Sequence, residues 1–370
     1  MSEKKIRKMI GEIFLELAEG LETGQLGKTP VIGIAADGSE HGKENLKEAA
    51  GLAAERGIKV HLIEGEDSHK AMENLLEQGE IDGAVTMHYP FPIGVSTVGK
   101  IVTPAKGKTM FLATTTGTSD TDRVCALVKN AIYGIIAAKA DGTAHPTVGI
   151  ANIDGARQCE KALRRLQEGG YPISFAESAR ADGGVVMRGN DLLTATADVM
   201  VMDSLTGNLM AKIFSSYTTG GSFESLGWGY GPGIGEEFEK TILIISRASG
   251  APVIAAAAEY AAHLIQNDMN RIAKEEFKLA KKAGLSRVLN ELAKKETASK
   301  TEEIVAAPPK EVVTAQIPGI EVMDLEDAVT ALWKEKIYAE SGMGCTGPII
   351  RISEANKEKS EKILSHKGFI

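Results

Sequence analysis

The amino-acid sequence predicts an α/β protein built on an open, doubly wound and mostly parallel β-sheet. From residue 30 onward, short apolar runs rich in β-branched residues alternate with helical patterns. Polar and apolar positions alternate little within the runs, which is typical of strands buried on both faces of a parallel sheet. The length of 370 residues allows one large α/β unit with an appendage, or two domains.

Seven apolar runs are the predicted strands, and the segments between them, including 43–56 and 121–140, are predicted helices. Alternation of this kind indicates βαβ units with right-handed crossovers. The strand runs are PVIGIAAD, IKVHLIEG, DGAVTMH, TMFLATTT, TVGIANID, PISFAES and DVMVMD.

The N-terminal segment predicts an amphipathic helix, because its apolar residues recur at the helical period. Charged residues interrupt it throughout, so we expect neither a signal peptide nor a transmembrane helix. We expect this helix to dock on the body of the protein rather than on a membrane. The apolar residues are Ile6, Met9, Ile10, Ile13, Phe14 and Leu17.

The C-terminal third indicates a boundary between two units. A helical pattern follows residue 250, and residues 294–316 are charged, small and interrupted by Pro308 and Pro309, which favours a linker. We therefore predict an α/β domain with its N-terminal helix over 1–293, a linker over 294–316, and a compact segment over 317–370.

Charge and cysteine content exclude several classes of protein. The net charge of −8 and the absence of a basic stripe argue against a nucleic-acid-binding protein. Three cysteines without a CxxC pair fit neither a disulfide framework nor a zinc site, and no other pattern supports a metal. We expect a cytoplasmic enzyme that uses no metal and no cofactor.

Residues that follow the predicted strands are candidates for a ligand crevice, which in open α/β sheets lies beyond the carboxyl ends of strands. Thr116 and Ser119 follow one strand and could hold an anion, or Ser119 or Asp120 could simply cap the next helix. His88 follows another strand and could be an acid, a base or a hydrogen-bonded structural residue.

Two glycine-containing segments fail as nucleotide-binding motifs. In GWGYGPGIG (227–235) no register fits G-x-G-x-x-G, and the GKT at 27–29 lacks the earlier glycine of a phosphate-binding P-loop. The first segment is then either a functional lid or a plain connecting loop.

The segment DSLTGNLMAK (203–212) joins the end of a buried strand to the start of a helix. Thr206, Gly207 and Asn208 could offer a hydroxyl, an amide and a side-chain donor at a helix N-terminus, which favours an anion such as phosphate. Lys212 adds a positive charge one turn beyond Asn208, and Asp203 could order the turn. The alternative is a capped turn without a ligand.

A cysteine in a glycine-rich segment is the remaining candidate. Cys345 lies in AESGMGCTGPII (339–350), whereas Cys125 lies in an apolar helical pattern typical of a small core residue. The placement of Cys345 therefore favours a reactive thiol.

Residues 203–212 resemble the signature DGFTGNVxLK of the phosphate acyltransferases of bacterial phospholipid synthesis. Asp203, Thr206, Gly207, Asn208 and Lys212 match it. Members of that family move an acyl group from a thioester carrier to inorganic phosphate. The resemblance covers roughly residues 30–290 and implies an open sheet like that of isocitrate and isopropylmalate dehydrogenases.

The acyltransferase-like body, the proline-containing linker and ESGMGCTGP together closely resemble the alpha subunit of component C of the glycine, sarcosine and betaine reductases of amino-acid fermentation. The resemblance implies that Cys345 is acetylated at the expense of a carboxymethyl group on selenoprotein A, and that inorganic phosphate then releases acetyl phosphate. It also implies a ketoacyl-synthase-like beta subunit as partner, within a homo- or hetero-oligomer.

The chemistry implied for Cys345 needs a thiolate, whose formation nearby amide dipoles favour. We expect Gly342, Gly344 and Gly347 to turn backbone amides toward the sulfur. The same amides could stabilise an oxyanion, at about 3 to 4 kcal/mol per well-placed donor.

Two alternatives stay open. The chain could transfer an acyl group directly from acyl carrier protein to phosphate, with Cys345 incidental. It could instead be a non-catalytic scaffold that positions a catalytic beta subunit.

Overall fold

A computed structural model describes most of the chain: residues 7, 10–11, 13–15, 17–18, 21, 29–35, 37–65, 67–180, 183–299, 305–321, 324–344 and 347–370.

Eleven of the described strands form one sheet, in the order β2-β1-β3-β11-β10-β4-β5-β9-β6-β7, with β8 beside β6. Their bounds are β1 Val31–Ala35, β2 Lys59–Leu62, β3 Gly83–Thr86, β4 Val95–Val102, β5 Thr109–Thr118, β6 Thr147–Ala151, β7 Ser174–Phe175, β8 Val186–Met187, β9 Val199–Val201, β10 Gly231–Ile234 and β11 Ile242–Ile244.

The sheet consists of two parallel halves that run in opposite directions. Strands β2, β1, β3 and β11 are parallel, and so are β5, β9, β6, β7 and β8. Between the halves, the pairs β11–β10, β10–β4 and β4–β5 are antiparallel. The predicted α/β class with a largely parallel sheet is confirmed, but uniform βαβ crossovers are wrong. Residues 103–108 between β4 and β5 are too few for a crossover, which takes about a dozen.

This topology places carboxyl ends of strands at two opposite edges of the sheet. The carboxyl ends of β1, β3 and β11 lie at one edge of the sheet, called here the β11 edge. The carboxyl ends of β5, β9 and β6 lie at the other, called here the β9 edge. A ligand crevice can therefore be sought at either edge.

Helices cover the sheet, and two of them, α4 and α8, are mostly buried. The predicted helices at 43–56 and 121–140 are confirmed as α2 and α4. Helices α4 and α8 bury most of their residues, as expected of largely apolar helices. The bounds are α2 Gly42–Glu55, α3 Ser68–Gln78, α4 Arg123–Ala140, α5 Ala156–Glu168, α6 Gly189–Thr194, α7 Ser204–Ser216, η1 Tyr217–Thr219, α8 Ala251–Gln266, α9 Met269–Lys282 and α10 Leu285–Ser299.

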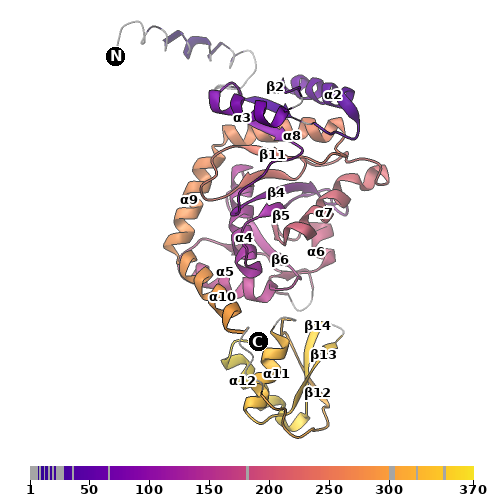
Figure 1. The fold of residues 1–370 in the computed structure, drawn as a ribbon, viewed down its shortest axis with the longest axis vertical. Helices are drawn as coiled ribbons and strands as arrows, with labels where there is room; N and C mark the ends of the chain where they lie inside the picture. Colours follow the sequence, from indigo (N-terminus) through magenta and orange to yellow (C-terminus); the bar gives the residue numbers. More distant parts are fainter. Residues whose placement is uncertain are drawn as a thin grey trace.

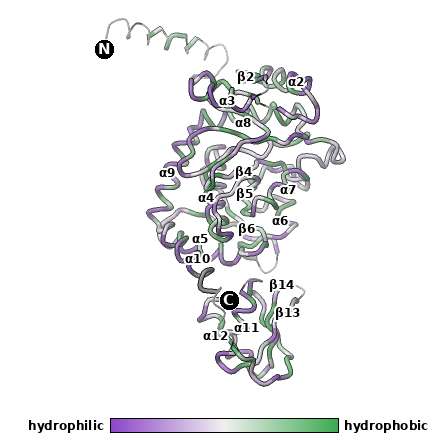
Figure 2. Tube along the Cα trace, viewed as in Figure 1, coloured by the Kyte–Doolittle hydropathy of each residue, from purple (hydrophilic) through white to green (hydrophobic). Residues whose placement is uncertain are grey.

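The hydropathy of the surface helix α9 matches its position against the body of the protein. Figure 2 shows α9 changing repeatedly between hydrophilic and hydrophobic positions along its length, because one face of the helix packs on the body and the other meets solvent.

The glycine-rich segment 227–235 is not a lid or a plain loop. Its second half is β10, a buried strand between β11 and β4 at the centre of the sheet. A β-carbon on Gly231 would lie 1.7 Å from the carbonyl oxygen of Val98, and its φ is +84°. Glycine is needed because the backbones approach so closely.

A separate antiparallel sheet, β12-β14-β13, forms the C-terminal unit together with α11 and α12. It has its own apolar cluster, and Figure 1 shows it at the end of the molecule opposite to α2 and α3. The bounds are β12 Ala315–Pro318, α11 Leu325–Lys334, β13 Ala339–Gly344, β14 Gly347–Ile352, η2 Glu354–Asn356 and α12 Lys357–His366.

The predicted domain limits at 293/294 and 316/317 fall inside α10 and β12. The division into domains stays a prediction.

The predicted N-terminal helix lies only partly within the described residues, and Ile6 and Met9 fall outside them. The described residues there are helical, but their apolar side chains are exposed, with Phe14 at 67%. Docking on the body is thus wrong for Ile10, Ile13, Phe14 and Leu17. Across the described part of the chain, no helix combines the length and apolarity needed to cross a membrane.

Candidate functional site

Asp203 caps the helix that carries most of the predicted site residues. It follows β9, and its carboxylate accepts hydrogen bonds from the Thr206 amide at 3.0 Å and the Thr206 hydroxyl at 2.6 Å. An aspartate at this position satisfies a free amide and suits the positive end of the helix dipole. Asp203 therefore orders the turn as predicted, and it occupies the donors of Thr206 that were expected to face an anion.

The next two residues hold α7 against the sheet. A β-carbon on Gly207 would lie only 1.8 Å from the carbonyl oxygen of Thr114, so the helix backbone touches the backbone of β5. Asn208 donates a hydrogen bond from Nδ2 to the carbonyl oxygen of Thr115 at 3.2 Å. Both residues fix where α7 lies.

Lys212 lies at the other edge of the sheet. Helix α7 starts at the β9 edge with Ser204, and eight residues further on, a rise of about 12 Å, Lys212 reaches the β11 edge. Its Nζ donates to Ser246 Oγ at 3.4 Å, just beyond the end of β11, and its side chain is half exposed. The motif predicted to converge on one point is therefore spread along a helix, and Lys212 presents the accessible charge.

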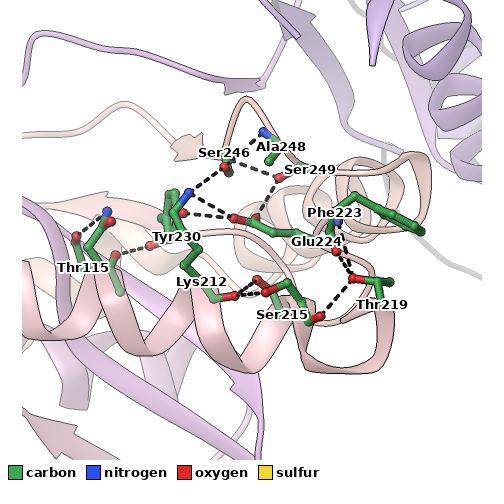
Figure 3. Close-up of polar contacts among 12 residues, drawn as sticks. Thr115, Lys212, Ser215, Thr219, Phe223, Glu224, Tyr230, Ser246, Ala248 and Ser249 are labelled. Carbon is green, nitrogen blue, oxygen red and sulfur yellow. Dashed lines mark hydrogen bonds and ion pairs between the residues drawn. The ribbon is translucent and has the colours of Figure 1, made fainter. Parts of the chain in front are cut away.

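A polar network around Lys212 was missed from the sequence (Figure 3). The carboxylate of Glu224 lies 3.6 Å from Lys212 Nζ and accepts hydrogen bonds from Tyr230 and Ser249 at 3.1 Å each. Glu224 lies in an ordinary-looking loop and Tyr230 within the glycine-rich segment. Neither position carries a local signal that could have revealed the contact.

The threonine-rich strand end turns inward. The Thr115 hydroxyl donates to the carbonyl oxygen of Tyr230 at 2.6 Å, and the Thr116 hydroxyl bonds that of Thr97 at 2.8 Å. Ser119 is buried and donates to Asn130 Oδ1 at 2.6 Å. The hydroxyls of Thr116 and Ser119 are thus both bonded to other side chains of the protein.

The capping prediction for the following helix was wrong. The N-cap of α4 is Asp122, which accepts from the Cys125 amide at 2.7 Å, and neither Ser119 nor Asp120 takes that place. His88 is exposed just after β3, where Thr86 Oγ1 donates to its carbonyl oxygen. It lies at the β11 edge, apart from Asp203 and Thr206.

Two of the three cysteines are unsuited to nucleophilic chemistry. Cys125 and Cys159 are buried, and desolvation raises the pKa of each thiol well above its usual range. Cys345 lies outside the described residues. Its neighbours Gly342 and Gly344 end β13 and Gly347 begins β14, with Gly344 paired to Gly347, so these glycines belong to paired strands.

The C-terminal unit contacts the body at the start of α5. The carboxylate of Glu321 accepts hydrogen bonds from the amides of Arg157 at 2.5 Å and Gly155 at 3.3 Å, and Gln158 donates to Asp324 at 2.8 Å. Burial raises the pKa of the Glu321 carboxyl, although these amide donors oppose the shift. Because α5 follows β6, this contact lies at the β9 edge.

No group of three or more His, Cys, Asp or Glu side chains among the described residues is placed to hold a metal ion.

Comparison with known proteins gives three matches. A protein-family model described as "Fatty acid synthesis protein" matches residues 31–351. A glycine/sarcosine/betaine reductase complex component C subunit alpha from Peptoclostridium acidaminophilum is 57% identical over 381 residues, covering 99% of this chain and 99% of the relative. A phosphate acyltransferase from Phenylobacterium zucineum (strain HLK1) is 33% identical over 141 residues, covering 33% of this chain and 37% of the relative.

Proposed function

Because the chain belongs to the family of alpha subunits of component C of the glycine/sarcosine/betaine reductase complex, we propose that it transfers an acetyl group from a thioester on Cys345 to inorganic phosphate, releasing acetyl phosphate. The predicted resemblance is thereby confirmed, and acyltransferase chemistry fits the shorter match to a phosphate acyltransferase. The 57% identity across 99% of both chains is the observation that carries the proposal.

The choice of Cys345 as the acyl carrier is supported by elimination. Cys125 and Cys159 are buried with raised thiol pKa values, so neither offers an accessible thiolate at neutral pH. Cys345 lies in sequence between β13 and β14, flanked by Gly344 and, after Thr346, by Gly347. We propose that amides of Gly342, Gly344 and Gly347 favour the thiolate and the oxyanion of the tetrahedral intermediate.

The proposed acceptor step uses the charge of Lys212. A phosphate oxygen attacks the thioester carbonyl carbon, a carbon–oxygen bond forms, the carbon–sulfur bond breaks, and the cysteine leaves as a thiolate. The half-exposed ammonium of Lys212 is suited to hold the phosphate, with Asp203, Thr206, Gly207 and Asn208 setting the position of the helix that carries it.

The docking contact of the C-terminal unit and the Lys212 ammonium lie at opposite edges of the sheet. The C-terminal unit contacts the body at the β9 edge, whereas Lys212 lies at the β11 edge. Acetyl transfer therefore requires either movement of the C-terminal unit or a phosphate site completed by another subunit. We propose a beta subunit and a selenoprotein A that carries the carboxymethyl group as partners, in a cytoplasmic complex.

Direct acyl transfer from acyl carrier protein to phosphate is the second candidate, favoured by the similarity to a phosphate acyltransferase. It makes Cys345 dispensable, as would a purely scaffolding role.

Peptide mass spectrometry after incubation with acetyl phosphate tests the proposal. We expect one added acetyl group, on the Cys345 peptide, in the wild type and in Cys125→Ser, and none in Cys345→Ser. Acetyl phosphate turnover by a chain that never acquires this acetyl group would exclude the covalent route.

A further inference from the structure

Glu224 is a buried carboxylate that the proposed chemistry leaves unused. Its side chain and backbone are 1% exposed in total. The Glu224 amide donates to the carbonyl oxygen of Ala248 at 3.0 Å, and its own carbonyl oxygen accepts from the Gly250 amide at 2.9 Å. The residue is thus pinned on both sides to the loop that leads from β11 into α8.

Three groups compensate for the buried charge (Figure 3). The hydroxyl of Tyr230 donates to Oε1 and the hydroxyl of Ser249 to Oε2, each at 3.1 Å. Ser249 Oγ in turn accepts from the Ser246 amide at 3.1 Å, which fixes its orientation. The only cation paired with Glu224 in the described part of the chain is Lys212, with Nζ 3.6 Å from Oε1. A buried carboxylate without such partners would cost several kcal/mol.

The contact restrains a lysine that is otherwise free to move. The Lys212 side chain is half exposed and has a flexible four-carbon stem, so without these partners its ammonium would sample many positions. Glu224 on one side and Ser246 Oγ on the other hold the ammonium where α7 meets the end of β11. An ammonium has three donors; Lys212 donates one hydrogen bond to Ser246 Oγ and is ion-paired with Glu224, so donor capacity remains for a ligand.

We propose that Glu224 is the positioning residue for Lys212: it holds the ammonium in place for phosphate without touching the phosphate itself. This inference rests on the proposed function, because it assigns the anion held by Lys212 to inorganic phosphate. The proposal also explains why a buried carboxylate lies beside an anion site: the fixed negative charge of Glu224 attracts the Lys212 ammonium and sets its position.

The test measures KM for phosphate in the exchange of labelled phosphate into acetyl phosphate by the intact component C complex. Glu224→Gln keeps the size of the side chain and can still bond Tyr230 and Ser249, but it removes the charge facing Lys212. We expect KM for phosphate to rise about fivefold, modest because Lys212 is half exposed, while kcat changes less. Binding of inorganic phosphate alone, followed as a rise in melting temperature, should weaken by a similar factor.

Glu276→Gln is the matched control. Glu276 is also a buried glutamate held by a lysine and a tyrosine, with Lys139 at 2.6 Å and Tyr171 at 2.8 Å, but it lies on α9 against α4. We expect this variant to lower the melting temperature and leave KM for phosphate unchanged. If Glu224→Gln behaves in the same way, Glu224 is only structural and the proposal is overturned.

Two further variants cover the other outcomes. Should Glu224→Gln fail to fold, Glu224→Asp keeps the charge and withdraws it from Lys212, and an unchanged KM for phosphate would overturn the proposal. In a Lys212→Met background, Glu224→Gln should have no additional effect on KM, because the residue acts only through Lys212. Absence of exchange in the wild-type complex would instead contradict the proposed function.

Discussion

Replacing Gly207 with alanine tests how closely α7 lies against the sheet. A β-carbon at this position would be 1.8 Å from the carbonyl oxygen of Thr114 and 2.8 Å from its carbonyl carbon. Ordinary carbon–oxygen contacts are about 3.3 Å or longer, so α7 would have to move away from β5 by about 1.5 Å. That movement would also break the hydrogen bond from Asn208 to Thr115.

The expected loss of stability combines two opposing effects. Overpacking a close contact costs about 1 to 3 kcal/mol, and a clash with backbone rather than a flexible side chain places Gly207→Ala at the upper end. Alanine in a helix interior recovers up to about 1 kcal/mol relative to glycine. We therefore expect the free energy of unfolding to fall by about 2 kcal/mol, or by about 4 °C in melting temperature.

Gly51→Ala is the matched control, because Gly51 lies inside α2, is exposed, and has no atom within 4 Å of its ideal β-carbon. It should raise the melting temperature slightly, by the helix-propensity gain alone. Thermal unfolding followed by circular dichroism compares the two variants. Equal stability of Gly207→Ala and Gly51→Ala would refute the close approach of α7 to β5.

Three further predictions concern caps, thiols and pH. Asp203→Ala should lower the free energy of unfolding by about 1 to 2 kcal/mol, and by more than Asp67→Ala does. Asp203 accepts hydrogen bonds from an amide and a hydroxyl, whereas the Asp67 side chain accepts one from an amide. Thermal unfolding of both variants checks this order. Cys125 and Cys159 should resist iodoacetamide at about pH 8 and react only in denaturant, as peptide mapping would reveal, because burial raises their pKa. The pKa of Glu321 is raised above its unperturbed value of 4.5, so the docked state keeps the carboxyl proton to higher pH than the undocked state does. Docking of the C-terminal unit should therefore weaken as pH rises above 4.5. Limited proteolysis of residues 305–314 should speed up with pH, and the increase should be smaller in Glu321→Gln.

The sequence predicted the elements whose signals are local. Helix α4 was predicted from its largely apolar pattern, and β9 followed by a capped helix from the apolar run before Asp203. The antiparallel centre of the sheet was not predictable in this way. It depends on pairing between β4 and β10, which are more than a hundred residues apart, and β10 is a glycine-rich strand that reads as a loop.

The same distinction applies to the site. Lys212 was identified because it belongs to a compact motif, but its partners come from segments that meet only in the folded chain. Glu224 becomes buried because its backbone pairs with the loop before α8. The rise of α7 separates Lys212 from Asp203, and the opposite directions of the two half-sheets bring the end of β11 to Lys212, which no local pattern encodes.

The central claim is that acetyl phosphate forms through an acetyl-cysteine on Cys345. Exchange of radiolabelled phosphate into unlabelled acetyl phosphate, catalysed by the purified component C complex without any amino-acid substrate, tests it most directly, because such exchange requires an acetyl-enzyme intermediate in a ping-pong reaction. We predict exchange by the wild type and by Cys125→Ser, and none by Cys345→Ser. Undiminished exchange by Cys345→Ser would contradict the account.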